Sequence, residues 1–383
     1  MINQLTKSKE MKKIWIGIGV IVVVLVIVLI VTQTKKEPKE IKIGAILPLT
    51  GKMGAFGEWQ QRALLLAEEK INAENMLSGK KIKFVFEDSK ADPKEAVAAI
   101  NKLINVDKLK IFFVFKSTLI EAVEPITDKA KVLLFAFAMD PELGQSPYTF
   151  RIYPNMKQQN SVMVEFLKQS PSTERIAILY VITPATEFLV PKMLIPAIKE
   201  IGKSVVSVQS FEEEDKDIRT QVSKIKASNP DMVITLAHFV FIPNILITLK
   251  EMGLLEKVGI LGDLSYTFQL KVPMELLEGI YFVSPSYELK TIEPTKATWF
   301  EKRCLEKYGE YPGYDPTFFF DTAMILAEGL KQYGINVEKL KNYLSTVHEY
   351  PGVTGSITIE KNRDAKIDMI IGNFKDGKRL PIK

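Results

Sequence analysis

The chain alternates short apolar runs with helical patterns from Lys42 onward, and this alternation constrains the fold more than any other feature. The predicted strands of the first half are Ile43–Leu47, Lys81–Phe86, Lys110–Phe115 and Val132–Ala136. Helical spacing separates them, at Gln60–Asn72, Pro93–Ile104 and Ser117–Lys129. Repeated units of strand, helix and strand are typical of a parallel, doubly wound sheet.

A second block of the same kind follows the segment PYTFRIYP at Pro147–Pro154. Its predicted strands are Arg175–Val181, Val205–Phe211, Met232–Leu236, Val258–Leu261 and Ile280–Val283. Two blocks of similar size, joined near Arg151, predict two α/β lobes, and a length of 383 residues fits two domains. Beyond them we expect a long helix over Phe318–Gln332 and strands at Ser356–Ile359 and Met369–Phe374.

An uncharged segment, Ile14–Thr34, precedes the first block. At about 1.5 Å per residue it would span about 31 Å as a helix, close to the thickness of a bilayer core. It is longer than a secretory signal core, and Val31–Thr34 is a poor cleavage site. We therefore expect a single-pass, uncleaved signal anchor at 14–34, with a cytoplasmic tail at 1–13 and a charged linker at 35–40.

Composition argues against several classes of function. The 51 basic and 46 acidic residues are mixed, without a basic block of the kind that binds nucleic acid. Cys304 is the single cysteine, so an intrachain disulfide is excluded. The two histidines, His238 and His348, form no metal-ligand pattern, and no nucleophile–base motif is present. We expect no enzyme activity, no metal and no cofactor.

Two loops of the first block are candidate binding elements. Gly51, Gly54 and Gly57 surround Phe56 after the first strand, where glycines let backbone approach a ligand, although a plain turn fits equally. Ser117 and Thr118 open a helix after a buried strand. Free amides and hydroxyls there suit a carboxylate, and Ser117 alone also fits a helix N-cap.

Two further loops carry acidic residues. Ala138, Met139 and Asp140 follow the next strand, where carbonyls and Asp140 could accept an ammonium group, or Asp140 could cap a helix. Asp263 follows a strand of the second block and could pair with an ammonium group, or be an exposed loop residue. Ligands of such sheets bind at the carboxyl ends of strands, where all of these residues lie.

The sequence resembles the leucine/isoleucine/valine-binding proteins, the extracytoplasmic solute-binding proteins of ABC transporters with the type I periplasmic-binding fold. The resemblance is carried by Ile43–Asp88, by DPKEAVAAINKLI (Asp92–Ile104), by PYTFRIYP and by GVTGSITIEKNRD (Gly352–Asp364). It extends from about Lys42 to the C-terminal end.

The resemblance implies two lobes joined by three crossovers, with residues 41–151 and 281–350 in lobe 1 and 152–280 and 351–383 in lobe 2. Closure of the lobes about a hinge would trap the ligand. Carried over by position, Phe56 covers the ligand and Ser117 and Thr118 bind its carboxylate. Ala138, Met139 and Asp140 form the contact loop, His238 or Phe239 takes the place of an aromatic residue, and Asp263 binds the ammonium group.

Three positions depart from the family pattern. Lys116 stands where a small or polar residue is usual, Met139-Asp140 replaces Ala-Thr or Ser, and Thr183–Thr186 replaces Asp-x-x-Tyr-Gly. These changes bear on the ligand and leave the fold assignment intact.

Together with the anchor expected at 14–34, the resemblance implies a binding domain on the extracytoplasmic face that feeds an ABC permease. The expected ligand is a small zwitterion, a branched-chain or other aliphatic amino acid. The alternatives are a sensory receptor ectodomain of the same fold that binds amino acids or amides, and an enzyme, which lacks a recognisable catalytic group. Neighbouring permease and ATPase genes would favour transport.

Overall fold

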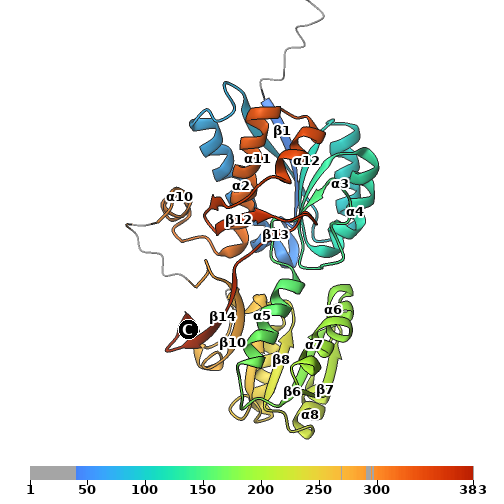
Figure 1. Cartoon of the computed structure of the whole chain (residues 1–383), viewed down its shortest axis with the longest axis vertical. Coiled ribbons are helices and arrows are strands. Elements are labelled where there is room, and N and C mark those ends of the chain that lie inside the picture. Colours follow the sequence, from blue (N-terminus) through green and yellow to red (C-terminus); the bar gives the residue numbers. More distant parts are fainter. Residues whose placement is uncertain (1–39, 269, 290–294, 296, 383) are drawn as a thin grey trace, which may run out of the picture. The chain divides into compact units, whose positions relative to one another are not determined.

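The computed structural model describes residues 40–382 except 269, 290–294 and 296, and the fold is that of the compact unit Lys42–Lys383 (Figure 1). The predicted tail (1–13), the predicted anchor (14–34) and nearly all of the predicted linker (35–40) lie outside the described residues. None of the helices in the described part of the chain is both long and apolar enough to cross a bilayer.

The first sheet has five strands in the order β2-β1-β3-β4-β5. These are β1 (Glu40–Leu47), β2 (Lys81–Asp88), β3 (Ile111–Phe115), β4 (Leu133–Phe137) and β5 (Thr149–Phe150). The pairs β1–β3, β3–β4 and β4–β5 are parallel. Every residue of β3 and β4 is buried, as expected for parallel strands with helices on both faces.

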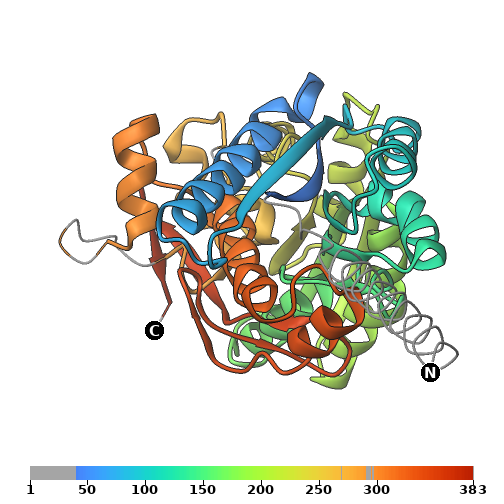
Figure 2. The ribbon, with the colours of Figure 1, turned by 90° about the horizontal axis from the view of Figure 1, so that it is seen from above.

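Helices of the first lobe come from both halves of the chain. The early ones are α2 (Gly54–Ala73), α3 (Pro93–Asn105) and α4 (Ser117–Ala130), and the late ones are α10 (Trp299–Tyr308), α11 (Tyr314–Tyr333) and α12 (Val337–Leu344). The views agree that α2 and α11 lie side by side, and the two helices pack extensively (Figure 2). The lobe is therefore completed only after the chain returns from the second lobe.

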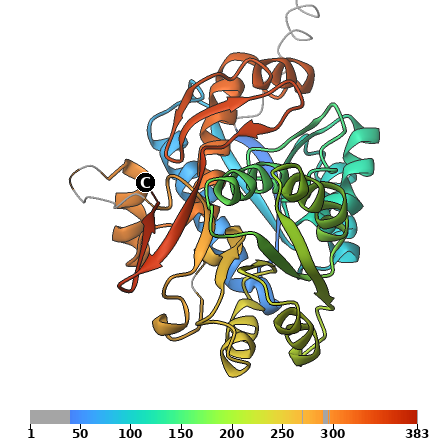
Figure 3. The same ribbon diagram turned by 60° about the horizontal axis from the view of Figure 1, so that its bottom comes forward.

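The second sheet has seven strands in the order β15-β14-β10-β9-β8-β6-β7. They are β6 (Arg175–Val181), β7 (Ser204–Phe211), β8 (Met232–Leu236), β9 (Gly259–Gly262), β10 (Tyr281–Pro285), β14 (Met369–Lys375) and β15 (Lys378–Pro381). The strands from β7 to β10 are parallel, whereas β14 runs antiparallel beside β10 and β15 antiparallel beside β14 (Figure 3).

Helices α5 (Met156–Lys168), α6 (Pro184–Leu189), α7 (Ile195–Glu200), α8 (Arg219–Ala227) and α9 (Ile242–Glu251) belong to the second lobe. Helices α6 and α7 are joined by one π-turn, Val190–Leu194, so the helical stretch from α6 to α7 is nearly continuous. Apolar residues of α8 and α9 pack with the sheet in one buried cluster.

Three connections join the lobes, as the resemblance implies: from β5 to α5, from β10 to α10, and from β13 (Ala365–Lys366) to β14. The predicted lobe boundary at residue 281 needs correction, because β10 pairs with β9 and β14 in the second sheet. The predicted start of the last lobe 2 segment, residue 351, also needs correction, because the strands that follow it pack with the first lobe. Strands β11 (Tyr350–Gly352) and β12 (Gly355–Ile359) join β13, and their turn binds Asp321 on α11.

A buried ion pair ties the first and third connections together. Arg151 donates from Nε to Asp364 Oδ1 at 2.8 Å and from Nη2 to Asp364 Oδ2 at 2.9 Å. Its third nitrogen, Nη1, donates to the backbone carbonyl of Asp140. Asn155 adds a bond to Asp364 Oδ2 at 3.1 Å. One guanidinium therefore holds two interlobe connections and one candidate ligand loop.

Candidate functional site

A cavity of about 410 Å³ lies between the two lobes, at the carboxyl ends of strands from both sheets. The first lobe contributes the loops after β3 and β4, and the second lobe contributes the loops after β6, β8 and β9. This is where doubly wound sheets bind ligands. All predicted site residues except Phe56 line it: Ser117, Thr118, Ala138, Met139, Asp140, His238 and Asp263.

The start of α4 presents hydrogen-bond donors to this cavity. Lys116, with φ of +83°, is the N-cap residue and makes no side-chain cap, so Ser117 is the first helical residue rather than the cap. Ser117 Oγ accepts a long hydrogen bond, 3.4 Å, from the amide of Asp140. Thr118 Oγ1 is buried and has no hydrogen-bond partner among the described residues. Free helix-start amides beside an unused hydroxyl suit an anionic group.

Asp263 faces the same cavity from the second lobe. Its side chain caps a short 3₁₀ turn, where Oδ1 accepts from Ser265 N at 2.9 Å, and the residue is only 6% exposed. It is therefore not an exposed loop aspartate. Burial raises the pKa of Asp263 to about 7, against hydrogen bonds from Ser265 and Ala237 that lower it. No salt bridge to Asp263 occurs within the described residues, so a ligand cation would supply the missing charge.

Asp140 is also buried, and its carboxylate is partly occupied. Oδ1 accepts from Glu142 N at 2.9 Å, which closes a turn, and no helix follows. The expectation that Asp140 caps a helix is therefore wrong. Its backbone carbonyl accepts from Arg151, so this carbonyl is already engaged and is not free to receive an ammonium ion.

His238 lies at the mouth of the cavity with a 45% exposed side chain. Its Nε2 is 3.7 Å from Glu213 Oε1. Desolvation in the cleft lowers the pKa of His238, the Glu213 carboxylate raises it, and the charge of Lys116 from the other lobe lowers it again. The pKa of His238 is lowered overall, which favours a neutral imidazole at neutral pH.

Phe56 does not line this cavity. The centroid of its ring lies 4.6 Å from that of Phe239 and 4.5 Å from that of Phe268, both in the second lobe. The ring centroid of Phe115 lies 6.2 Å away. Of these four rings, that of Phe115 lines the cavity and the other three do not. Gly57 allows α2 to bring Phe56 to these rings, because a Cβ at Gly57 would lie 2.2 Å from the carbonyl oxygen of Pro48.

Several lining residues were not predicted from the sequence. Tyr153, in the first connection, lines the cavity and donates its hydroxyl to Asp315 Oδ1 at 2.8 Å. Thr183 and Thr186 form a capping box at the start of α6 and line the cavity from the second lobe. The pattern Thr-Pro-x-Thr before a helix was a readable cap signal, whereas the position of Tyr153 depends on contacts remote in sequence.

The described residues contain no group of three or more His, Cys, Asp and Glu side chains able to hold a metal ion. Cys304 is buried in α10, and burial raises the pKa of its thiol to about 12. A thiol held in this protonated form is a poor nucleophile.

Comparison with known proteins identifies the family of this chain. The sequence profile of a periplasmic binding protein family matches residues 40–378. The chain belongs to this family of solute-binding proteins, and the resemblance to leucine/isoleucine/valine-binding proteins is confirmed.

Individual relatives are distant in sequence. A Leu/Ile/Val-binding protein homolog from Brucella abortus is 24% identical over 365 residues, covering 90% of this chain and 91% of the relative. A leucine-binding protein from Thermotoga maritima has a TM-score of 0.75 at 21% identity, covering 90% of this chain and 98% of that one. A branched-chain amino acid transporter substrate-binding protein from Streptococcus pneumoniae, solved with isoleucine, has a TM-score of 0.74 at 21% identity, with 90% and 99% covered.

Proposed function

We propose that this chain is the extracytoplasmic solute-binding protein of an ABC importer and that it captures a small zwitterion, an aliphatic amino acid, in the 410 Å³ cavity. One observation carries the proposal. Asp263, a buried carboxyl group without a cationic partner among the described residues, faces the same cavity as a helix start where Thr118 has a hydroxyl that no described group bonds. A small ligand that carries both a positive and a negative charge can pair with Asp263 and with the helix start at once.

In this arrangement Ser117 and Thr118 hold the ligand carboxylate and Asp263 holds its ammonium group. The aliphatic side chain lies against apolar lining such as Phe115, Phe137 and Val181. Cavities of this volume enclose small molecules and fix them with a few polar groups. The two halves of the site stand on different lobes, so a bound zwitterion favours the closed arrangement about the three connections.

The proposal extends to the rest of the import system. A permease would receive the solute from the closed protein, and residues 14–34 would anchor the chain with its binding lobes on the extracytoplasmic face. Relatives named as Leu/Ile/Val-binding proteins and as transporter substrate-binding proteins support the importer. A receptor ectodomain that binds amino acids or amides is the alternative, and specific co-purification with a permease separates the two.

Thermal unfolding of the full-length chain tests the ligand class. We expect leucine, isoleucine or valine to raise the melting temperature, because ligand at 100 times its Kd adds about 2.7 kcal/mol to the native state. The matched amides lack the carboxylate, and the matched carboxylic acids lack the ammonium group, so both should shift the melting temperature less. No shift with any amino acid contradicts the proposed ligand, and an equal shift with the amide removes the role of Ser117 and Thr118.

Binding is also expected to depend on pH through Asp263. The pKa of the free site is about 7, and an ammonium ligand pairs with the ionised carboxylate, so below pH 7 a proton must leave before binding. Affinity for an aliphatic amino acid should fall by up to about tenfold for each pH unit below 7. The other titratable groups that line the cavity are Lys116, Glu121, Asp140, Glu213 and His238, and the lowered pKa of His238 favours its neutral form near pH 7.

Isothermal titration calorimetry from pH 8 to pH 5 measures this dependence. A free amino acid does not titrate in that range, so the change reports the protein. Asp263→Asn is the matched control, and any residual binding by this variant should show a flat profile. A wild-type affinity that is constant over the range excludes Asp263 as the ammonium partner.

A further inference from the structure

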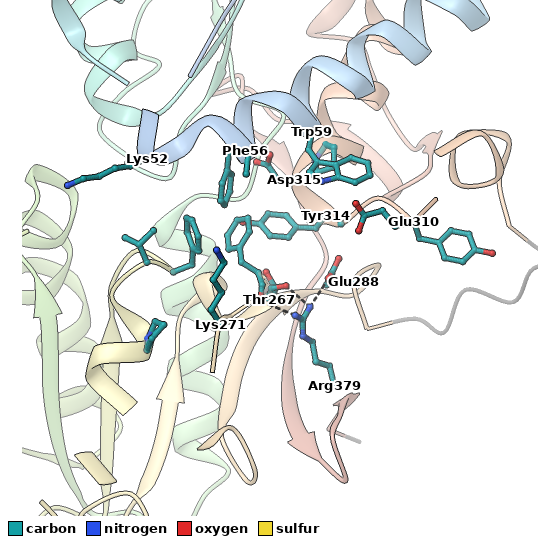
Figure 4. Close-up of a pocket in the computed structure, with 18 residues that line it drawn as sticks. Lys52, Phe56, Trp59, Thr267, Lys271, Glu288, Glu310, Tyr314, Asp315 and Arg379 are labelled. Carbon is teal, nitrogen blue, oxygen red and sulfur yellow. Dashed lines mark hydrogen bonds and ion pairs between the residues drawn. The ribbon is translucent and has the colours of Figure 1, made fainter. Parts of the chain in front are cut away.

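The first lobe has two ends, and the ligand site occupies one of them. A cavity of about 610 Å³ extends the interlobe site already described, and Figure 4 shows that Phe56 of α2 and Tyr314 of α11 line it. Both residues stand at the start of their helices, so α2 and α11 run side by side from the cleft toward the opposite end of the lobe. We call this opposite end the distal end.

The parallel strands β1, β3 and β4 begin at the distal end, because their carboxyl ends lead into the loops at the cleft. In the register of the sheet, Gly44 lies opposite Phe112, and Ile111 lies opposite Leu133. The residues one or two positions before these pairs therefore lie at nearly the same level on adjacent strands. Three of them are lysines: Lys42, Lys110 and Lys131.

Exposed lysines at the distal end form a surface that we call the distal lysine patch. Its members are Lys42, Lys81, Lys108, Lys110, Lys129 and Lys131. Lys81 belongs to it because β2 runs in the direction of β1: Asp88, at the carboxyl end of β2, accepts from the amide of Leu49 just after β1 at 2.9 Å. None of these lysines makes an ion pair with a described residue. They come from separate segments, which is why the sequence shows no basic block.

Acidic residues near the patch are fewer, and some are already paired with other lysines. Glu74 pairs with Lys70, and Glu338 Oε2 lies 2.8 Å from Lys341 Nζ. The other acidic residues next to the patch in the sequence are Glu40, Asp107 and Asp128. The patch therefore keeps an excess of positive charge, which attracts negatively charged surfaces.

Two exposed apolar residues lie at the same end of the lobe. Val106 stands between α3 and β3, and its exposure of 71% is the highest among the large apolar residues of the described chain. Ile335, 42% exposed, connects α11 to α12. Lysines around exposed apolar side chains are typical of surfaces that bind a bilayer, because the lysines pair with lipid phosphates while the apolar groups enter the boundary with the acyl chains.

Chain length also brings the patch close to the membrane. Residues 35–41 separate the predicted anchor, 14–34, from Lys42, and an extended chain of that length reaches at most about 25 Å. Lys42 is itself a member of the patch, whereas the cleft lies at the other end of the first lobe. A tether this short favours contact between the bilayer and the distal end.

We propose that the distal lysine patch, with Val106 and Ile335, is an interaction surface for a membrane rich in anionic phospholipid. The partner is the extracytoplasmic face of the membrane that residues 14–34 would span, so this inference rests on the anchor proposed above. Contact at the distal end turns the interlobe cleft away from the bilayer, toward the solution from which solute arrives. Each lysine near an anionic surface strengthens such contact about fivefold, and salt weakens it.

Fluorescence quenching in vesicles measures this contact. Cys304→Ser removes the native thiol, and Asn105→Cys places an exposed dye at the distal end, next to Val106. The full-length chain is reconstituted into vesicles of phosphatidylcholine, alone or in equal parts with phosphatidylglycerol, both containing a lipid with a nitroxide on its headgroup. We expect quenching of the dye to be at least about twofold greater in the anionic vesicles, and to fall to the neutral level when salt shortens the Debye length from about 8 Å to about 3 Å.

Charge substitutions then locate the contact. Glutamine at four patch positions should reduce quenching in anionic vesicles to the neutral level: Lys42→Gln, Lys108→Gln, Lys110→Gln and Lys131→Gln. The matched control changes four exposed lysines of the second lobe and should leave quenching unchanged: Lys199→Gln, Lys224→Gln, Lys250→Gln and Lys257→Gln. Asp107→Lys gives an independent arm if the patch variant fails to fold, because it adds positive charge to the patch and should increase quenching.

A dye on Ser223→Cys, an exposed position of α8 in the second lobe, is the control for orientation, and its quenching should not depend on lipid charge. Equal quenching of the distal dye in both kinds of vesicle, or in a folded patch variant and the wild type, overturns the proposal. So does quenching at Ser223→Cys that depends on lipid charge as strongly as at the distal dye.

Flotation with neutral vesicles in high salt tests the anchor separately. A chain that does not float with them lacks the anchor, and the proposed orientation at the membrane falls with it. Thermal unfolding with amino acids reports the solute site independently of both results, so failure of the membrane contact leaves the proposed solute binding standing.

Discussion

Asp263→Ala is expected to weaken binding of the amino acid ligand by more than about tenfold, because a desolvated charge partner is lost. The residue is buried beside the cavity, and no cation neutralises it within the described residues. Truncation therefore leaves the ligand ammonium group without a counter-charge at a buried position. Calorimetric titration of the wild-type and variant chains at pH 8, where Asp263 is ionised, measures the change directly.

Two controls separate charge from structure. Asp263→Asn can still accept the hydrogen bond from Ser265, so an equal loss in both variants identifies the charge rather than the cap as the cause. Asp321→Asn changes another buried carboxyl group, hydrogen-bonded by Val353 and Thr354, which does not line the 410 Å³ cavity. Affinity should not change in it. Wild-type affinity in a folded Asp263→Ala chain would remove the assigned role.

Arg151→Leu is expected to cost about 3–5 kcal/mol of folding free energy, because it leaves Asp364 as a buried charge without its partner. Arg151 is 3% exposed and Asp364 is nearly as well buried, and the pair makes two parallel bonds. The same substitution releases the carbonyl of Asp140. Denaturant unfolding followed by circular dichroism gives the free energy from the midpoint and slope.

Arg219→Leu is the matched control for this effect. Arg219 and Asp217 also form two bonds, at 2.9 and 2.6 Å, but their side chains are exposed, so the unfolding midpoint should hardly move. The double variant Arg151→Leu/Asp364→Leu should recover part of the lost stability, since neither charge then remains buried. If Arg151→Leu behaves like Arg219→Leu, the connection between the lobes does not depend on this pair.

Much of the fold could be predicted because its signals are local. The buried strands β3 and β4 are continuous apolar runs, and Asp92 before Pro93 is a local cap signal that α3 uses. The boundary between the lobes was misplaced at β10 for a nonlocal reason. An apolar strand before a helix has the same sequence pattern whichever lobe it belongs to, and only its pairing with β9 and β14 decides.

The site was predictable to the extent that it follows strand ends. Ser117, Asp140 and Asp263 follow β3, β4 and β9, and parallel strands bring their ends together. The position of Phe56 could not be predicted in this way, because it depends on Phe239 and Phe268 in the other lobe. Residue type also gave no indication that Lys116, rather than Ser117, would precede the helix with a positive φ.

The hydrogen bonds of Arg151 to Asp364 and to the carbonyl of Asp140 have an evolutionary consequence. Arg151 binds the candidate ligand loop through the main-chain carbonyl of Asp140 and makes no bond to the side chains of Met139 and Asp140. Those side chains can therefore be exchanged by mutation without altering the group that Arg151 recognises. Under the proposed function, ligand preference can change by substitution at these two positions while the Arg151–Asp364 pair between the lobes is kept.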